Sequence, residues 1–169
     1  MDGDRAESPA SHPARCVRTA LPASGNTRIV TTTAYSHHEA DHLAYGRRSA
    51  LGNTLRYGSE IRSAAADWSV YPAGTTFRVE GLPWTYVVDD YGSALVGTGV
   101  IDLYQPDMTA MKRWGRRSVR IAILQWGSYS NSARILSRRT HHAHCRAMFE
   151  AILRRIRSAA PTCVRTPRA

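Results

Sequence analysis

Residues 87–104 read VVDDYGSALVGTGVIDLY and carry two groups of carboxylates, Asp89 with Asp90 and then Asp102. Each group lies near a run of Val and Ile residues, which favour extended structure, and three glycines separate the two. Such runs bend back on themselves, so the carboxylates can meet in the folded chain. A third acid, Asp67, occupies a similar position in AAADWSVYPAGT, before a turn that contains Pro and Gly.

Carboxylates that share a pocket are chemically useful because they cannot both ionise freely. The pKa of one rises, and that acid becomes able to donate a proton near neutral pH, as in glycosidases. A simpler interpretation is that Asp89 and Asp90 cap the turn before Gly92, a position that Asp often takes. From composition and spacing alone, the turn interpretation is favoured.

Six short motifs in a fixed order carry a more specific signal. They are TTTAYS (31–36), SALG (49–52), AAADWSVYPAGT (64–75), VVDDYGSALVG (87–97), IDLY (101–104) and WGRRSVRIAIL (114–124). Together they resemble the three-aspartate (3D) domain of bacterial cell-wall proteins, which is shared with the catalytic domain of membrane-bound lytic transglycosylase A. Six ordered motifs over about 95 residues are far more specific than a single one.

The resemblance assigns the three aspartates of that family to Asp67, Asp90 and Asp102. The Asp102 segment, IDLY, is unchanged. Beside Asp67, Trp68 stands where the family usually has Pro. Around Asp90 the departures from the family pattern are Tyr91, Ser93 and Leu95.

The resemblance also implies a role for each site residue. Asp102 would be the general acid and base, Asp90 would raise the pKa of Asp102 and stabilise positive charge at the anomeric carbon, and Asp67 would hold the pocket geometry. The neighbouring Asp89 is expected to alternate to the other face of its strand and to tolerate change. The expected substrate-binding residues are Thr33, Tyr35, Gly92 and Ser93.

The activity implied is that of a peptidoglycan lytic transglycosylase, a lyase that needs no cofactor. It would cleave the bond between N-acetylmuramic acid (MurNAc) and N-acetylglucosamine (GlcNAc) and leave a 1,6-anhydro sugar. The alternative is a non-catalytic glycan-binding module on the same fold, which the departures at Tyr91 and Ser93 favour. A nucleic-acid-binding protein is a further alternative, driven by arginines near the end of the chain.

The fold expected is mainly β. Short strands separated by turns predict a closed barrel, and the resemblance specifies a six-stranded double-psi β-barrel (barwin-like) with short helices. Strands are predicted over 27–35, 61–66, 75–80, 84–89 and 118–126, with a helix over 106–114. A basic amphipathic helix is predicted near 143–158, and it could pack on the barrel, lie on an anionic surface or do neither.

The chain divides by composition into three expected parts: a disordered segment (1–26), the barrel domain (27–127) and a basic tail (128–169). The formal net charge is +10. Residues 128–169 hold 9 basic residues and 1 acid, whereas 33–127 hold 10 and 9. The charge thus belongs to the tail, which is expected to contact an anionic surface, and nucleic acid is not expected in the groove. We expect a monomer that binds peptidoglycan glycan strands.

Three further observations bear on location and metal binding. The first residues hold no apolar run of the kind that a secretory signal needs, although the resemblance implies a cell-envelope location. The three cysteines imply no disulfide framework. His38 and His42, in SHHEADH, have the spacing of metal ligands on a helix, but a polar loop over the mouth of the groove is the simpler interpretation, and no metal is expected.

Overall fold

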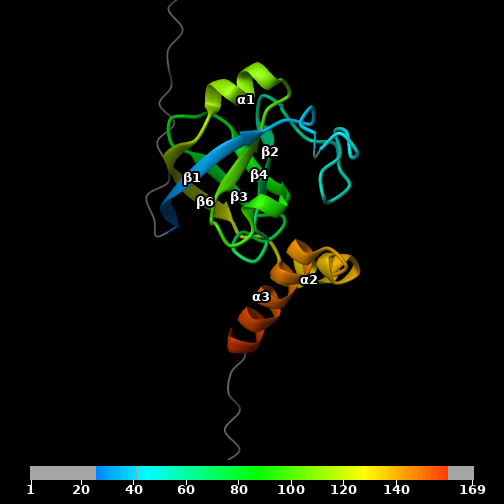
Figure 1. The fold of residues 1–169 in the computed structure, drawn as a ribbon. Helices are drawn as coiled ribbons and strands as arrows, with labels where there is room; N and C mark the ends of the chain where they lie inside the picture. Colours follow the sequence, from blue (N-terminus) through cyan, green and yellow to red (C-terminus); the bar gives the residue numbers. More distant parts are fainter. Residues whose placement is uncertain (1–25, 41, 160–169) are drawn as a thin grey trace, which may run out of the picture.

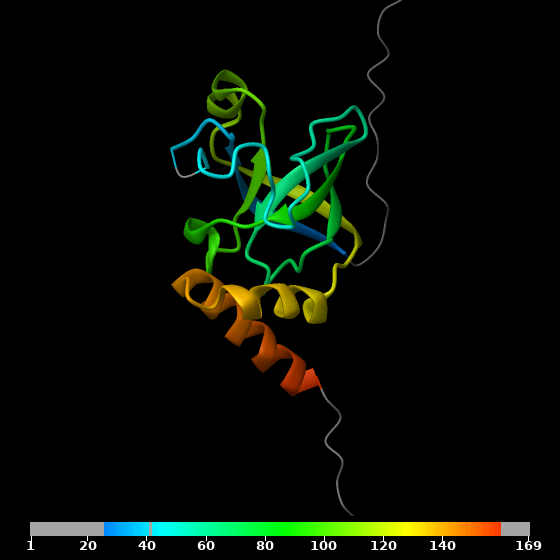
Figure 2. The ribbon, with the colours of Figure 1, turned by 90° about the vertical axis from the view of Figure 1, so that its right-hand side faces the viewer.

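The computed structural model describes residues 26–40 and 42–159. Six strands close into a barrel in the order β1-β5-β2-β4-β3-β6. Helix α1 lies at one end of the barrel, and α2 and α3 lie at the other (Figures 1 and 2). The elements are β1 (Thr27–Tyr35), β2 (Ile61–Ala66), β3 (Thr76–Val79), β4 (Thr85–Asp90), η1 (Ser93–Leu95), β5 (Ile101–Tyr104), α1 (Met108–Trp114), β6 (Arg117–Gln125), α2 (Tyr129–Leu136), η2 (Ser137–Arg139) and α3 (Ala143–Ala159).

The strand pairing is mixed. β1 pairs in parallel with β5, and β2 pairs in parallel with β4. The other four pairings are antiparallel. Two parallel pairs, each built from strands that are not consecutive in the chain, give the interlocked connections of a double-psi barrel, so the expected fold class is confirmed.

The predicted bounds of the strands hold to within one residue. β1 and β2 begin and end as expected, and β3, β4 and β6 each differ by one residue at both ends. Helix α1 begins at Met108 and not at Pro106, because the Asp107 side chain accepts a hydrogen bond from the Ala110 N–H (2.7 Å) and so caps the helix. The described residues between β1 and β2 form turns and two isolated bridges, and they make up the long loop that extends from the barrel in Figure 1.

The barrel interior combines small and large side chains. β2 contributes Ala64 and Ala66, both fully buried, and this leaves room for larger side chains from other elements. Phe77 stacks on Tyr86 with ring centroids 5.4 Å apart, and Trp68 is also fully buried. The Ala-rich sequence of β2 is therefore a packing requirement of a narrow barrel.

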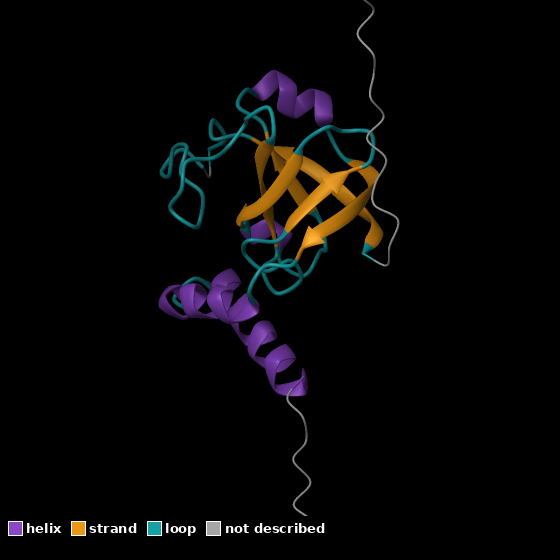
Figure 3. Ribbon diagram, turned by 180° about the vertical axis from the view of Figure 1, so that it is seen from behind, coloured by secondary structure: helices purple, strands orange, loops and turns teal. Residues whose placement is uncertain are grey.

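The two C-terminal helices cover the end of the barrel opposite α1 (Figure 3). The apolar face of α3 buries Cys145, Met148 and Ile152 in the main core, so of the three alternatives for this helix the structure has the packed one. Helix α2 is not predicted from the sequence, because its segment, YSNSARIL, is short and mostly polar. It is held by the buried Ser132, whose Oγ accepts a hydrogen bond from the Ala73 N–H (2.9 Å).

Several expectations lie outside the described residues. They include the disordered state of residues 1–25 and the positions of Cys16 and Cys163; Cys145 is buried and free. The division of the chain at residues 26 and 127 stays a prediction. Within 26–40 and 42–159, no helix combines the length and the apolar character that crossing a membrane requires.

Gly127 joins β6 to α2 and provides the first test. A Cβ added there would lie 2.2 Å from the Ala73 carbonyl oxygen and 2.5 Å from that of Pro72, so the backbone would have to move. We expect Gly127→Ala to lower the free energy of unfolding by about 2–4 kcal/mol in urea titrations. Gly92→Ala is the control, because its Cβ would make ordinary contacts with Leu95 at 3.5 Å. Equal effects of the two substitutions would contradict the proposed close approach.

Candidate active site on the outer face of the barrel

One row of paired residues crosses four strands of the barrel. Thr33 pairs with Asp102, Asp102 pairs with Ala65, and Ala65 pairs with Asp90. Directly paired residues point to the same side of a sheet, so Asp102 and Asp90 share a face. Ala65 belongs to a small apolar cluster, separate from the main core, that also contains Tyr35 and Tyr104. The acids therefore lie on the outer face, over this second cluster.

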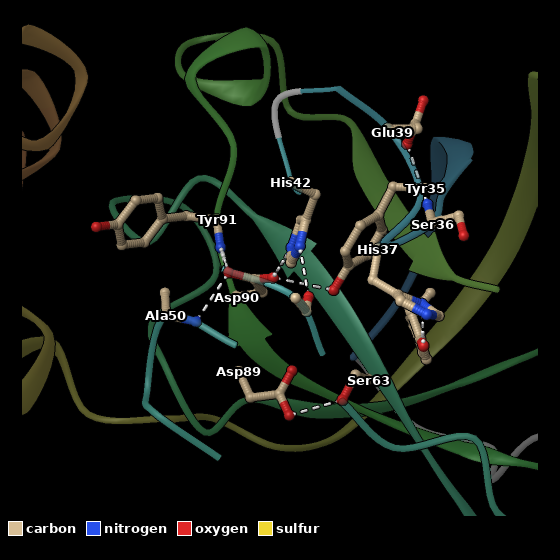
Figure 4. Close-up of polar contacts among 12 residues, drawn as sticks. Tyr35, Ser36, His37, Glu39, His42, Ala50, Ser63, Asp89, Asp90 and Tyr91 are labelled. Carbon is tan, nitrogen blue, oxygen red and sulfur yellow. Dashed lines mark hydrogen bonds and ion pairs between the residues drawn. The ribbon is translucent and has the colours of Figure 1, made fainter. Parts of the chain in front are cut away.

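A bulge in the pairing of β2 with β4 changes the position of Asp89. Ala64 pairs with Val88, but Ala65 pairs with Asp90, so Asp89 is an extra residue. The expected alternation is lost at this point. Asp89 is 2% exposed, and the Ser63 hydroxyl donates a hydrogen bond to its Oδ2 (2.7 Å; Figure 4). The prediction that Asp89 turns to the opposite face is wrong, because Ser63 and Ala65 are on one side of β2.

The environment of Asp89 favours its neutral form. Its Oδ1 is buried and has no hydrogen-bond partner among the described residues. Burial raises the pKa of Asp89 to about 6, the hydrogen bond from Ser63 opposes the shift, and the charge of Asp90 adds to it. A carboxyl group able to gain or lose a proton near neutral pH thus lies beside Asp90.

Asp90 is the best-connected side chain of the site. Its Oδ1 accepts hydrogen bonds from the backbone N–H groups of Ala50 (2.9 Å) and Tyr91 (3.0 Å). Its Oδ2 accepts one from the Tyr35 hydroxyl (3.1 Å) and lies 3.3 Å from His42 Nε2 (Figure 4). With donors on both oxygens, the carboxylate is fixed in orientation.

His42 is in the site, and its partners define its protonation. Nδ1 lies 3.0 Å from the Gly46 carbonyl oxygen, which can only accept, and Nε2 faces the carboxylate of Asp90. Both nitrogens donate when the ring is an imidazolium. The hydrogen bond to Asp90 raises the pKa of His42, although burial opposes the shift. The sequence indicated His42 only as a candidate metal ligand, and it did not predict the contact of His42 with Asp90.

Tyr35 is enclosed within the site. It is 7% exposed, and its ring lies 5.6 Å from that of His42 and 5.5 Å from that of Tyr104. Burial and the nearby carboxylates, Asp90 first among them, raise the pKa of its phenol well above the usual value. Thr33 is half-buried on the same face of β1, and its role in substrate binding stays a prediction. Tyr104 in turn shares a hydrogen bond with His37 Nδ1 (2.8 Å).

Asp67 holds two turns together. Its Oδ1 accepts hydrogen bonds from the Ser69 N–H (2.8 Å) and hydroxyl (2.7 Å), and its Oδ2 accepts one from the Gly97 N–H (2.8 Å). Gly97 has a φ of +77°, which favours glycine at that turn. The adjacent Trp68 donates its indole N–H to the Asp90 carbonyl oxygen (2.9 Å). These contacts suit the positioning role expected for Asp67, which stays a prediction.

The remaining predicted residues lie at the edge of the site. Gly92 precedes η1 and is half-buried, and Ser93 begins η1 and is exposed. His38 is exposed and stacks on His37, while Asp41 lies outside the described residues. In the part of the chain that the structure describes, no group of three or more His, Cys, Asp or Glu side chains could hold a metal ion.

Residues 62–125, which include all three aspartates and the bulge, match the model of the 3D domain. The chain therefore carries a 3D domain over this segment. The resemblance that the motifs indicated is confirmed, although β1 and His42 lie outside the matched segment.

Two known proteins are similar to part of this chain. One is the putative cell wall shaping protein YabE of Bacillus subtilis (strain 168), 32% identical over 101 residues, which are 60% of this chain and 24% of that protein. The other is the crystal structure of MltA from E. coli, with a TM-score of 0.38 and 26% identity over 47% of this chain and 28% of that one. The chain therefore spans about a quarter of the length of each.

The raised pKa of Asp89 predicts a pH-dependent stability. The folded state favours the protonated form of Asp89. The stabilising contribution of this proton is complete below the unfolded pKa of about 3.9 and is lost as the pH rises through the folded pKa of about 6, because the buried carboxylate is costly. Asp89→Asn should therefore be more stable than the wild type at pH 8, by about 3 kcal/mol, and nearly equal to it near pH 4. Urea titrations at both pH values test this, with the exposed Asp107→Asn as control. A difference that does not change with pH would refute the assignment.

The contact between His42 and Asp90 leads to a third prediction. His42 should titrate above 6.5, and His37, whose pKa burial lowers, should titrate below it. The stabilising contribution of His42 is then complete below pH 6.5 and is lost as the pH rises through its folded pKa. Histidine NMR titrations measure both residues, and Asp90→Asn should remove the upward shift at His42. If His42 titrates below 6.5 in the wild type, the ion pair does not form.

Proposed function

We propose that this protein is a lytic transglycosylase that cleaves the MurNAc–GlcNAc bond of peptidoglycan. The 3D domain over 62–125 supports this proposal, as does the name of the B. subtilis relative, which describes cell wall shaping. On this proposal the protein acts in the cell envelope, where its substrate lies, and its partner is the glycan strand.

The observation that carries the proposal is the row that joins Thr33, Asp102 and Asp90. One strand, β2, separates Asp102 from Asp90, which puts their Cα atoms about 10 Å apart at the usual strand spacing. The two acids therefore act on a substrate from separate positions, and one of them must carry both proton transfers. Transglycosylation needs a single acid, so this arrangement suits it.

Asp102 is the residue to which we assign both proton transfers. It is half-buried on the outer face. One side of its carboxyl group is therefore open to a substrate, and the other lies near the small apolar cluster. As an acid it protonates the glycosidic oxygen while the bond to the anomeric carbon breaks. As a carboxylate it then takes the proton from the muramyl 6-hydroxyl, whose oxygen forms the new bond to the anomeric carbon. Atoms and protons balance, and water is not consumed.

The neighbouring acids have supporting roles in this mechanism. Asp90, fixed by donors on both oxygens, offers a negative charge of defined position to the positive charge that develops at the anomeric carbon. Tyr35 and His42 hold that carboxylate and do not themselves transfer protons. Asp67 fixes the turns on which Asp90 and Asp102 depend.

A glycan-binding module without catalysis is the second candidate. Its support is the departure at Ser93, which is exposed at the start of η1 where a sugar would contact the chain. The departure at Tyr91 does not favour it, because the Tyr91 hydroxyl is occupied by Arg139 and Cys145. In either case we propose a monomer whose basic C-terminal segment contacts an anionic surface.

Digestion of purified peptidoglycan tests the proposal. The wild type should release anhydromuropeptides, read by mass spectrometry, and Asp102→Asn should lower the rate at least 100-fold, since general acid catalysis contributes about 10² to 10⁴. Asp107→Asn is the matched control: Asp107 is exposed, and Asn caps a helix as well as Asp does. If the folded wild type binds the wall and releases no sugar, the binding module replaces the enzyme.

A further inference from the structure

A hollow of about 190 Å³ lies between the loop that follows β1 and the C-terminal helices. One wall is formed by Ala50 and Leu51, and the other by the end of α2 and by η2. The second wall contributes Ile135 and three arginines, Arg134, Arg138 and Arg139. None of these arginines falls within the segment matched to the 3D domain.

The three arginines are not neutralised within the described part of the chain. No described carboxylate forms an ion pair with Arg134, Arg138 or Arg139. Arg134 donates to the Asn131 side chain (2.7 Å) and Arg139 to the Tyr91 hydroxyl (3.0 Å), and both acceptors are neutral. Three guanidinium groups around one hollow repel one another, so an anion placed there would be stabilised.

The hollow is joined to the acid site by two sets of hydrogen bonds. Ala50 donates its N–H to Asp90, and Leu51 donates its N–H to the Asp89 carbonyl oxygen (3.2 Å). On the other wall, Arg139 binds the hydroxyl of Tyr91, whose N–H binds Asp90. Figure 4 shows Ala50 and Tyr91 on the side of Asp90 that faces away from Tyr35. A ligand in the hollow would therefore lie beside the acids and not on a remote surface.

We propose that this hollow is an oxyanion subsite for a charged group carried by the substrate. The inference rests on the proposed function, and the group that fits best is a carboxylate of the peptide borne by a muramic residue. Such a peptide branches from the glycan strand, so it would point away from a glycan bound at Asp102 and Asp90. Guanidinium groups bind carboxylates through paired hydrogen bonds, and a phosphate of another wall polymer shares that chemistry.

The test compares binding to two forms of the same wall, both free of phosphate polymers. One is intact peptidoglycan, and the other is glycan from which an amidase has removed the peptides. The variant is Arg134→Gln with Arg138→Gln; Arg139 is kept because it holds Tyr91. The matched control is Arg154→Gln with Arg157→Gln, two exposed arginines of α3 that do not line the hollow.

We expect the variant to bind intact peptidoglycan about tenfold more weakly than the wild type and to bind stripped glycan equally well. The control pair should bind both forms as the wild type does. A third substrate, wall that retains its phosphate polymer, identifies the source of the anion. If only binding to that wall depends on Arg134 and Arg138, the oxyanion is a phosphate and the carboxylate assignment is overturned.

Other results overturn the subsite altogether. Equal weakening by the variant and the control pair would mean that general charge, not the hollow, attracts the wall. Equal wild-type binding to intact and stripped glycan would mean that no peptide contact exists, while release of anhydro sugar from both would leave the proposed function standing. A wild type that neither binds nor cleaves either form refutes both proposals.

Discussion

The carboxylate of Asp90 accepts hydrogen bonds from segments that lie far apart in the chain. Tyr35 comes from β1, Ala50 from the turns that follow it, and Tyr91 from the end of β4 itself. Because a buried carboxylate is costly without such donors, these segments must be in place together. The loop between β1 and β2 has little regular structure of its own, and its contacts with Asp90 give it a defined position over the acids.

The sequence predicted the strands well because each is a β-branched or Ala-rich run between turn residues, and the three aspartates followed from ordered motifs. Two features of the site could not be predicted from it. The bulge that moves Asp89 depends on how β2 and β4 are paired, which is not visible in a single strand. The contact of His42 with Asp90 joins residues 48 positions apart, and no local pattern reports it.

Two departures from the family pattern, Trp68 and Tyr91, lie against each other in the structure. Their rings meet edge to face, with centroids 4.9 Å apart, and both residues also contact the C-terminal part of the chain. The backbone N–H of Trp68 lies 3.4 Å from Met148 Sδ, and the Tyr91 hydroxyl accepts hydrogen bonds from Arg139 and Cys145. The side chain of Tyr91 therefore joins the end of β4 to η2 and α3, and the backbone of Trp68 adds a contact with α3. These contacts bring the arginines of α2 and η2 next to the acids.

The closure of the barrel by β1 has a practical consequence for any shortened form of this protein. β1 pairs with both β5 and β6, yet it lies before the segment that matches the 3D domain. A fragment cut at the limits of that match would leave β5 and β6 each with one unpaired edge. Open strand edges pair with other chains, so such a fragment would tend to aggregate during expression even though it contains all three aspartates.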